Sequence, residues 1–178
     1  GSPFQIYKIL DNKNSFLFES GSNKGKWSRY SIVGTQSNEM IKVNDNVISY
    51  INNGETKEIK SDDPLDWIEK FYTENQVSNL PEGVPFSGGL VGYFGYETIR
   101  YIEPRLNGVE KPDPLGCPDI LLMVSEEILV FDNLSGKVLL LTHANPEEVD
   151  AYNRAVARVS ELAEQLREIQ AKPQKHVN

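Results

Sequence analysis

The sequence contains one cysteine and two histidines among its 178 residues. Cys117 therefore cannot form an internal disulfide, and we expect an inert thiol in a reducing compartment. No charged segment followed by an apolar one opens the chain, so the expected location is the cytoplasm. His143 and His176 have none of the Cys or Glu spacings that are typical of zinc sites. We predict neither a catalytic residue nor a metal site in this chain.

Long apolar runs and basic clusters are also missing. The runs Ile120–Val124 and Val138–Leu141 are far shorter than the roughly 20 residues of a membrane helix. The net charge is -8, and no segment concentrates Lys or Arg, which argues against nucleic acid as a partner. With 39% hydrophobic and 25% charged residues, the composition is that of a folded globular protein.

Three segments carry helix signals. Ser2 and Pro3 predict the N-cap and first residue of a short helix, and Asp62-Asp63-Pro64 predicts the start of another that ends near Asn75. Asn145-Pro146-Glu147-Glu148 predicts the start of a long third helix. A stripe at spacings of three and four favours packing of this helix on a sheet face: Val149, Tyr152, Val156, Val159, Ala163, Leu166 and Ile169.

The remaining apolar segments predict strands, at Ser15–Ser20, Trp27–Gly34, Glu55–Lys60, Gly89–Phe94, Ile120–Phe131 and Lys137–Thr142. A β-hairpin is predicted around Asn44-Asp45-Asn46. Successive hairpins with helices between them predict an α+β fold with largely antiparallel sheets and helices on the outside. We expect one domain over residues 1–171 and a polar linker over 172–178.

One acidic pair and one glycine-rich segment could suggest a catalytic or phosphate-binding role. Glu126 and Glu127 lie inside a predicted strand, where neighbours point to opposite faces, so we expect solvated side chains and no acid/base pair. Ser87–Tyr96 is rich in glycine, but it lacks the Walker Lys-Ser/Thr pair, and its glycines are interleaved with strand residues. Such glycines more often mark a bulge or a close approach of two backbones.

The string Pro85–Tyr96, continued by Arg100–Leu106, resembles the signature of anthranilate synthase component I. Supporting it are Ser2-Pro3 with Tyr7, the strings Phe16–Ser20 and Ser28–Ser31, and Pro118-Asp119. Together these cover nearly the whole chain, which is identified as similar to the family's amino-terminal domain. The resemblance implies the α+β fold of that domain.

The family implies a large subunit that converts chorismate and ammonia to anthranilate and pyruvate in tryptophan biosynthesis. A glutamine amidotransferase subunit, component II, supplies the ammonia, and Mg²⁺ acts in the chorismate-binding domain. We expect that domain, and with it the Mg²⁺, to be absent from this chain. No cofactor is therefore expected here, and the chain alone should not turn over chorismate.

The family's amino-terminal domain also carries much of a feedback site for tryptophan. Its motif resembles Leu17-Phe18-Glu19-Ser20, and a carboxylate and hydroxyl there can contact an amino acid while apolar walls take the indole. The resemblance implies that the site includes Glu19, Ser20, Ser28, Arg29, Tyr30 and Pro3. Without it, Glu19 and Ser20 simply end a strand, and Arg29 is a surface cation.

Two alternatives remain open at this point. The chain also resembles the amino-terminal domain of aminodeoxychorismate synthase component I, an enzyme of folate synthesis, although Glu19 and the run through Arg105 favour anthranilate synthase. A stand-alone binding module without an enzymatic parent is the other alternative.

Overall fold

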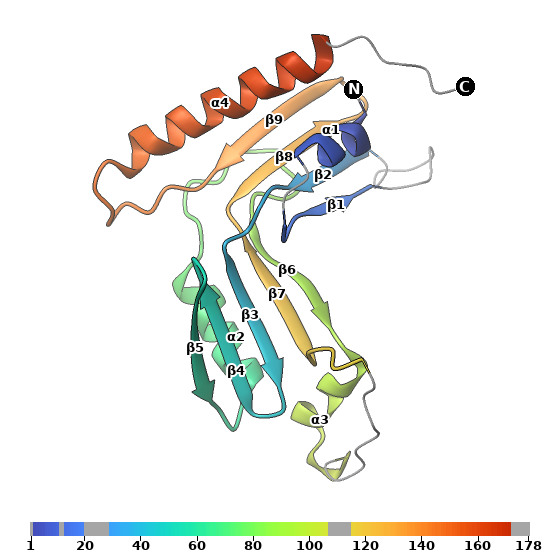
Figure 1. Ribbon diagram of the computed structural model, residues 1–178, viewed down its shortest axis with the longest axis vertical. Coiled ribbons are helices and arrows are strands. Elements are labelled where there is room, and N and C mark those ends of the chain that lie inside the picture. The colour runs from blue at the N-terminus through green and yellow to red at the C-terminus, as the bar shows by residue number, and fades with distance from the viewer. Residues whose placement is uncertain (1, 11–12, 20–28, 107–114, 172–178) are drawn as a thin grey trace. The chain divides into compact units, whose positions relative to one another are not determined.

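The computed structural model describes residues 2–10, 13–19, 29–106 and 115–171. The chain divides into two compact units, of which the first comprises Gly1–Gln36, Asn79–Gly88 and Glu126–Asn178 and the second Ser37–Ser78 and Gly89–Ser125. Each unit contains one antiparallel sheet with helices outside it (Figure 1). The predicted α+β class is confirmed. Among the described helices, none is long and apolar enough to cross a membrane.

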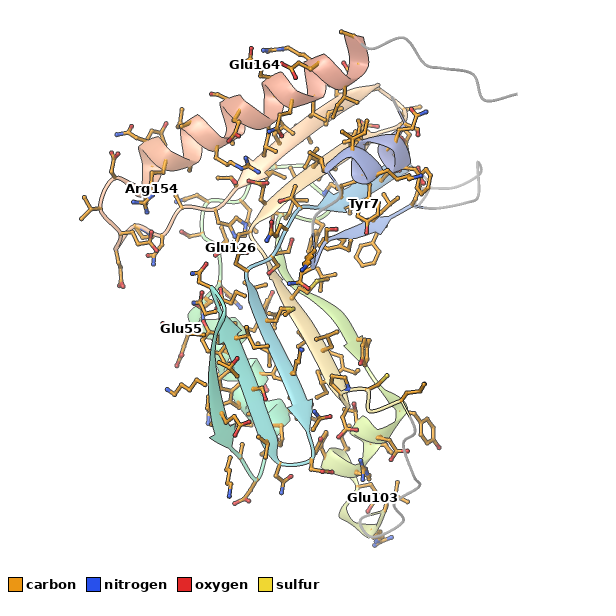
Figure 2. All side chains as sticks on the ribbon, viewed as in Figure 1. Tyr7, Glu55, Glu103, Glu126, Arg154 and Glu164 are labelled. Atoms are coloured by element: carbon orange, nitrogen blue, oxygen red, sulfur yellow. The ribbon has the colours of Figure 1, made fainter. Side chains whose placement is uncertain are left out.

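The first unit is built on sheet A, which has the strand order β1-β2-β8-β9 with every pair antiparallel. Its strands are β1 (Phe16–Phe18), β2 (Tyr30–Gly34), β8 (Glu127–Asp132) and β9 (Lys137–Thr142). Helices α1 (Pro3–Leu10) and α4 (Ala151–Ala171) pack on one face of this sheet. The buried core there consists of Ile6, Val33, Leu129, Phe131 and Leu166. Glu164 points away from the sheet on the outer side of α4 (Figure 2).

The second face of sheet A is also apolar. Ile128, Leu129 and Val130 follow one another in β8, and each is 0% exposed, although alternate side chains point to opposite faces. The segment Asn79–Gly88 contributes to covering this second face, because the Phe86 ring meets Phe16 edge-on at 6.4 Å. The second face of sheet A is therefore partly covered, unlike the fully wet face of many antiparallel sheets.

The second unit is built on sheet B, with the order β5-β4-β3-β7-β6 and antiparallel pairs throughout. Its strands are β3 (Glu39–Asn44), β4 (Val47–Asn52), β5 (Glu55–Lys60), β6 (Gly89–Phe94) and β7 (Ile120–Ser125). Helix α2 (Pro64–Glu74) lies across one face (Figure 1), where its buried Ile68 joins the core. The sheet contributes Ile41, Val43, Ile48, Ile120 and Leu122 to that core.

Local signals placed several elements correctly. The Ser2 hydroxyl accepts from the Gln5 amide at 3.3 Å, and the Gln5 side chain accepts from the Ser2 amide at 3.0 Å, which makes a capping box for α1. The Asp63 carboxylate caps α2 by accepting from the Asp66 amide at 3.0 Å. Asp45, in the β3–β4 turn, has φ of 49°. These confirm both helix starts and the predicted hairpin.

The prediction of one strand over Ile120–Phe131 is wrong. The segment forms β7 and β8, which belong to different sheets, and Glu126 (labelled in Figure 2) is the single residue between them. The prediction of solvated Glu126 and Glu127 side chains fails for Glu127, which is 15% exposed. Its carboxylate accepts from the Thr35 hydroxyl at 2.6 Å and from the Arg158 guanidinium at 2.7 Å. This contact raises the pKa of Arg158 and ties α4 to β2 and β8.

The predicted start of the long helix is also wrong. Asn145–Glu148 forms a turn, in which the Asn145 side chain accepts from the Glu147 amide at 3.0 Å, and α4 begins at Ala151. Asp150 interrupts the helix before that point, because its φ of 60° lies in the left-handed region. The apolar stripe packs only in its later half: Val149, Tyr152 and Val156 are exposed, whereas Leu166 is buried. Leu162, which was not part of the predicted stripe, is buried beside it.

The glycines of Ser87–Tyr96 allow close backbone approach, as interpreted from the sequence. At Gly92 in β6, an added Cβ would overlap the Leu121 carbonyl oxygen of β7. At Gly95, the Cβ would lie 2.9 Å from the Asp119 carbonyl oxygen, which already accepts from the Gly95 amide at 2.7 Å. Glycine at these positions therefore lets β6 and the residues after it lie against β7.

We predict that Gly92→Ala lowers the free energy of unfolding by about 1–3 kcal/mol, because the methyl group forces the β6 and β7 backbones apart. Urea unfolding followed by circular dichroism measures the change. Gly54→Asn is the control: nothing lies within 4 Å of an added Cβ there. Since Asn tolerates left-handed backbone, that change should stay within about 0.5 kcal/mol. Equal losses in the two variants would contradict the packing role of Gly92.

Candidate functional site

The predicted site residues that the structure describes gather around one end of sheet A. Phe18 pairs with Ile32 across the antiparallel β1 and β2, so Glu19, which follows β1, and Tyr30, which begins β2, lie at the same end of that pair. Glu19 is exposed to solvent. Ser20 and Ser28 lie outside the described residues. Strand pairing thus places Glu19 and Tyr30 at the same end of β1 and β2, although a long connection separates them in the sequence.

Pro3 enters the same unit from α1. It is the first residue of the helix, whose buried Ile6 joins the sheet A core and whose Tyr7 (labelled in Figure 2) packs beside it. This packing fixes α1 on the face of sheet A that Val33 and Leu129 share. Pro3 is half-buried and its role in the helix start is structural.

Arg29 is engaged by a residue that the sequence analysis did not identify. Its Nε donates to Asp132 Oδ1 at 3.0 Å and its Nη2 to Asp132 Oδ2 at 2.7 Å, a bidentate ion pair. The guanidinium carbon also lies 4.9 Å from the centre of the Tyr30 ring. The Arg29 carbonyl accepts from the Asn133 amide at 2.7 Å. Arg29 therefore joins the start of β2 to the end of β8.

The two side chains of the Arg29–Asp132 pair differ in their exposure to solvent. The Asp132 side chain is 9% exposed, whereas that of Arg29 is 44% exposed. The Arg29 guanidinium holds the pKa of the Asp132 carboxyl well below its usual range, and amides of Leu134 and Ser135 donate to the same carboxylate. No sequence motif marks Asp132, because its partner lies about a hundred residues earlier and only the strand register joins them.

An apolar row lies beside these residues on the second face of sheet A. Strand register aligns one residue from each strand: Phe18, Ile32, Val130 and Leu139. The end members remain open, with Phe18 52% exposed and Leu139 40% exposed, while Val130 is 0% exposed. Tyr30 shares this face, since it lies two residues before Ile32 in β2. The candidate site therefore consists of Tyr30 and this apolar row, with Glu19 just beyond the end of β1.

A separate cavity of about 420 Å³ occurs in the same unit and contains none of the predicted site residues. It lies among α1, the chain after β2 and α4, and is lined by Ile9, Leu10, Thr35, Gln36, Arg158, Gln165, Glu168 and Ile169. Its one cation, Arg158, is bound by Glu127 and Glu161. In the described ranges, no group of three His, Cys, Asp or Glu side chains could hold a metal ion.

The class of the protein is given by a family match. The chorismate binding enzyme family matches residues 13–178. The chain therefore belongs to the chorismate binding enzyme family.

Within that family, the chain is similar to anthranilate synthase component 1. The Pseudomonas aeruginosa protein of that name is 47% identical over 170 residues, which cover 94% of this chain and 34% of the relative. The Neisseria meningitidis serogroup B protein is 40% identical over 176 residues, which cover 97% and 36%. The chain thus spans about a third of the length of these curated relatives.

The fold comparison agrees. The crystal structure of anthranilate synthase component I from Streptococcus pneumoniae superposes with a TM-score of 0.63 at 25% identity, covering 98% of this chain and 35% of that one. The resemblance read from Pro85–Leu106 is confirmed by these matches.

We predict that the Arg29–Asp132 pair makes the fold acid-sensitive. The pKa of Asp132 is lower in the folded chain than its value of about 3.9 in an unfolded one. The pair's stabilisation is therefore complete above that value and is lost as the pH falls toward the folded pKa. The urea midpoint should drop between about pH 5 and pH 2.

Asp132→Asn should lower the midpoint at pH 7 and flatten its fall in acid. Asp66→Asn is the matched control, because Asp66 pairs with Lys70 on an open helix surface, where both side chains are more than half exposed. Urea titrations across this pH range compare the two variants with the unmodified chain. An acid profile that Asp132→Asn leaves unchanged would show that other carboxylates cause it.

Proposed function

We propose that this chain is the tryptophan-binding regulatory domain of an anthranilate synthase component I. The parent enzyme would convert chorismate and ammonia to anthranilate and pyruvate in the cytoplasm. The observation that carries the proposal is that Glu19, Tyr30 and an apolar row lie near the same end of strands β1 and β2 in sheet A. Similarity to proteins named anthranilate synthase component 1 over 94% of the chain supports it.

The geometry suits an amino acid with a large apolar side chain. The Glu19 carboxylate is exposed and can accept from a ligand ammonium group, and Ser20 follows it in the chain. Phe18, at 52% exposed, and Leu139, at 40%, offer apolar surface for an indole ring nearby on the second sheet face. This division between a charged edge and an apolar floor matches the two ends of tryptophan.

Arg29 takes a positioning role in this proposal. Two of its guanidinium nitrogens are bound to Asp132, and its carbonyl accepts from Asn133. It thereby fixes the backbone at Tyr30, the first residue of β2, and with it the position of the Tyr30 side chain. Loss of Arg29 would disturb the site through β2 even without a contact between Arg29 and the ligand.

Regulation follows if tryptophan binds two arrangements of the parent enzyme unequally, because only such a difference can shift activity at a separate site. We propose that Mg²⁺ and chorismate act in the part of the parent that this chain does not span. The 178-residue chain alone would then have no turnover. A glutamine amidotransferase subunit would supply ammonia to the parent.

Tryptophan binding tests the site directly. In the full-length parent, Glu19→Gln should weaken tryptophan binding by about tenfold to a hundredfold, since it removes a charged hydrogen-bond acceptor. Isothermal titration calorimetry measures the dissociation constant. Glu58→Gln, on the exposed strand β5, is the matched control and should bind like the unmodified enzyme. If the unmodified enzyme releases no heat with tryptophan, the regulatory proposal fails.

Product analysis tests the parent reaction. Incubation of the full-length parent with chorismate, ammonia and Mg²⁺ should give 2-aminobenzoate and pyruvate, whereas an aminodeoxychorismate synthase would give 4-amino-4-deoxychorismate. Chromatography separates the two products. We expect only 2-aminobenzoate, and no product from the 178-residue chain under the same conditions. Detection of the 4-amino product would assign the parent to folate synthesis.

A further inference from the structure

A short segment of the second unit exposes apolar side chains on one side. It consists of η2 (Tyr96–Thr98) and α3 (Ile99–Ile102), and it follows β6. Tyr96 is 90% exposed, Ile99 40% and Ile102 66%. Their spacing of three residues places them along one side of the two helical turns. We call these three residues the outward stripe.

The opposite side of the segment faces inward, where the Tyr101 ring packs against the sheet B core and polar groups bind Asp119. Thr98 is 8% exposed, and its hydroxyl donates to the Asp119 carbonyl oxygen at 3.3 Å. The Tyr101 hydroxyl donates to Asp119 Oδ2 at 2.6 Å, and Arg100 Nη2 lies 3.5 Å from Oδ1. The Asp119 carboxylate, 12% exposed, also accepts from the Asp45 amide at 3.1 Å. Asp119, the residue that precedes β7, thus contacts Thr98, Arg100 and Tyr101 on the inner side of the segment.

This arrangement differs from that of an ordinary surface helix, which turns its polar side to water, because the outer side of this segment carries the apolar residues of the outward stripe. The segment cannot roll over to bury the outward stripe, because rolling would break the bonds to Asp119 and leave a carboxylate poorly paired. Partial burial and the Asp119 bond raise the pKa of Tyr101, so its hydroxyl keeps the proton that it donates. The stripe is therefore held rigidly in its exposed position.

Rigid, exposed aromatic and branched aliphatic side chains are the usual centre of a protein interface. Phe94, at 55% exposed, lies next to the segment at the end of β6 and adds to the apolar surface. Charged side chains border it: Glu97 is 46% exposed and Glu103, labelled in Figure 2, is 48% exposed. An apolar centre with a charged rim is the composition of a docking surface.

We propose that the outward stripe is the docking surface for the rest of the parent polypeptide, the two thirds of the relatives' length that this chain does not span. A segment of the same polypeptide has a higher effective concentration than any separate subunit. Interfaces that never separate are also the most apolar, whereas a partner that dissociates leaves its surface in water. The proposal rests on the family relationship and is independent of tryptophan binding.

Hydroxyl-radical footprinting of the unmodified full-length parent tests the proposal without a substitution. Tyr96 and Tyr72 have the same chemistry, and in this chain Tyr96 is 90% exposed and Tyr72 49%. If the remainder of the polypeptide covers the outward stripe, Tyr96 is oxidised more slowly than Tyr72 in the full-length protein. Mass spectrometry of the two peptides gives the rates. Faster oxidation of Tyr96 than of Tyr72 overturns the proposal.

Cysteine labelling gives a second, independent measurement. Ile102→Cys and the control Lys70→Cys replace helical residues that are 66% and 68% exposed. In the native full-length parent, maleimide should modify Ile102→Cys about tenfold more slowly than the control, and in urea at the same rate. Rates within about twofold in the native protein overturn the proposal.

Two further outcomes assign the surface to another occupant and also overturn the proposal. Protection of Ile102→Cys only after a glutamine amidotransferase subunit is added would identify a separate partner. Protection that grows with the concentration of the parent itself would identify a second copy. Protection in the lone parent at every concentration is the result that we expect.

Discussion

Burial of strand β8 on both faces is the constraint on which the first unit depends. Ile128, Leu129 and Val130 are consecutive and all 0% exposed, so helices on one side of the sheet cannot satisfy them. α1 and α4 cover the face of Leu129, and the segment Asn79–Gly88 contributes to covering the other. The first unit is assembled from three stretches of chain because a strand of this composition needs cover on two sides.

A carboxylate with bound partners lies at each end of the buried strand β8. Glu127 is nearly buried, and it is tolerated because Thr35 and Arg158 occupy both carboxylate oxygens. Asp132, at the other end, has Arg29 and two backbone amides as partners. Each end of the buried strand is thus closed by a paired carboxylate. The proposed tryptophan site lies next to the second of these closures and takes its shape from it.

Local chemistry made much of the fold predictable from sequence. The capping box at Ser2, the Asp63 cap and the turn at Asp45 act over a few residues, so the sequence pattern contains all the information that they need. The division of Ile120–Phe131 depends on partners elsewhere: β7 pairs with β3 and β6, whereas β8 pairs with β2 and β9. An apolar run cannot reveal such a choice. The left-handed Asp150, which delays α4, is likewise invisible in helical periodicity.

The residues of the proposed site could be suggested only through family resemblance. Strand register places Glu19 and Tyr30 at the same end of the β1–β2 pair, and no motif of the kind that holds a metal or phosphate marks them. Arg29 was expected at a ligand, and the structure shows that its guanidinium binds Asp132. Asp132 itself could have been suggested only by the acidic end of an apolar strand, which is a weak signal.

The pairing of β2 with β8 has a consequence for the order of folding. Tyr30 and Asp132 are partners across most of the chain, and all of the second unit lies in the sequence between them. Within that insert, β3, β4 and β5 form two successive hairpins, which close short loops and so form fast. Closing the long loop costs less entropy once the insert is compact. The β2–β8 pairing is then expected to form last, whereas β8 can pair with β9 early through the short turn between Asp132 and Lys137.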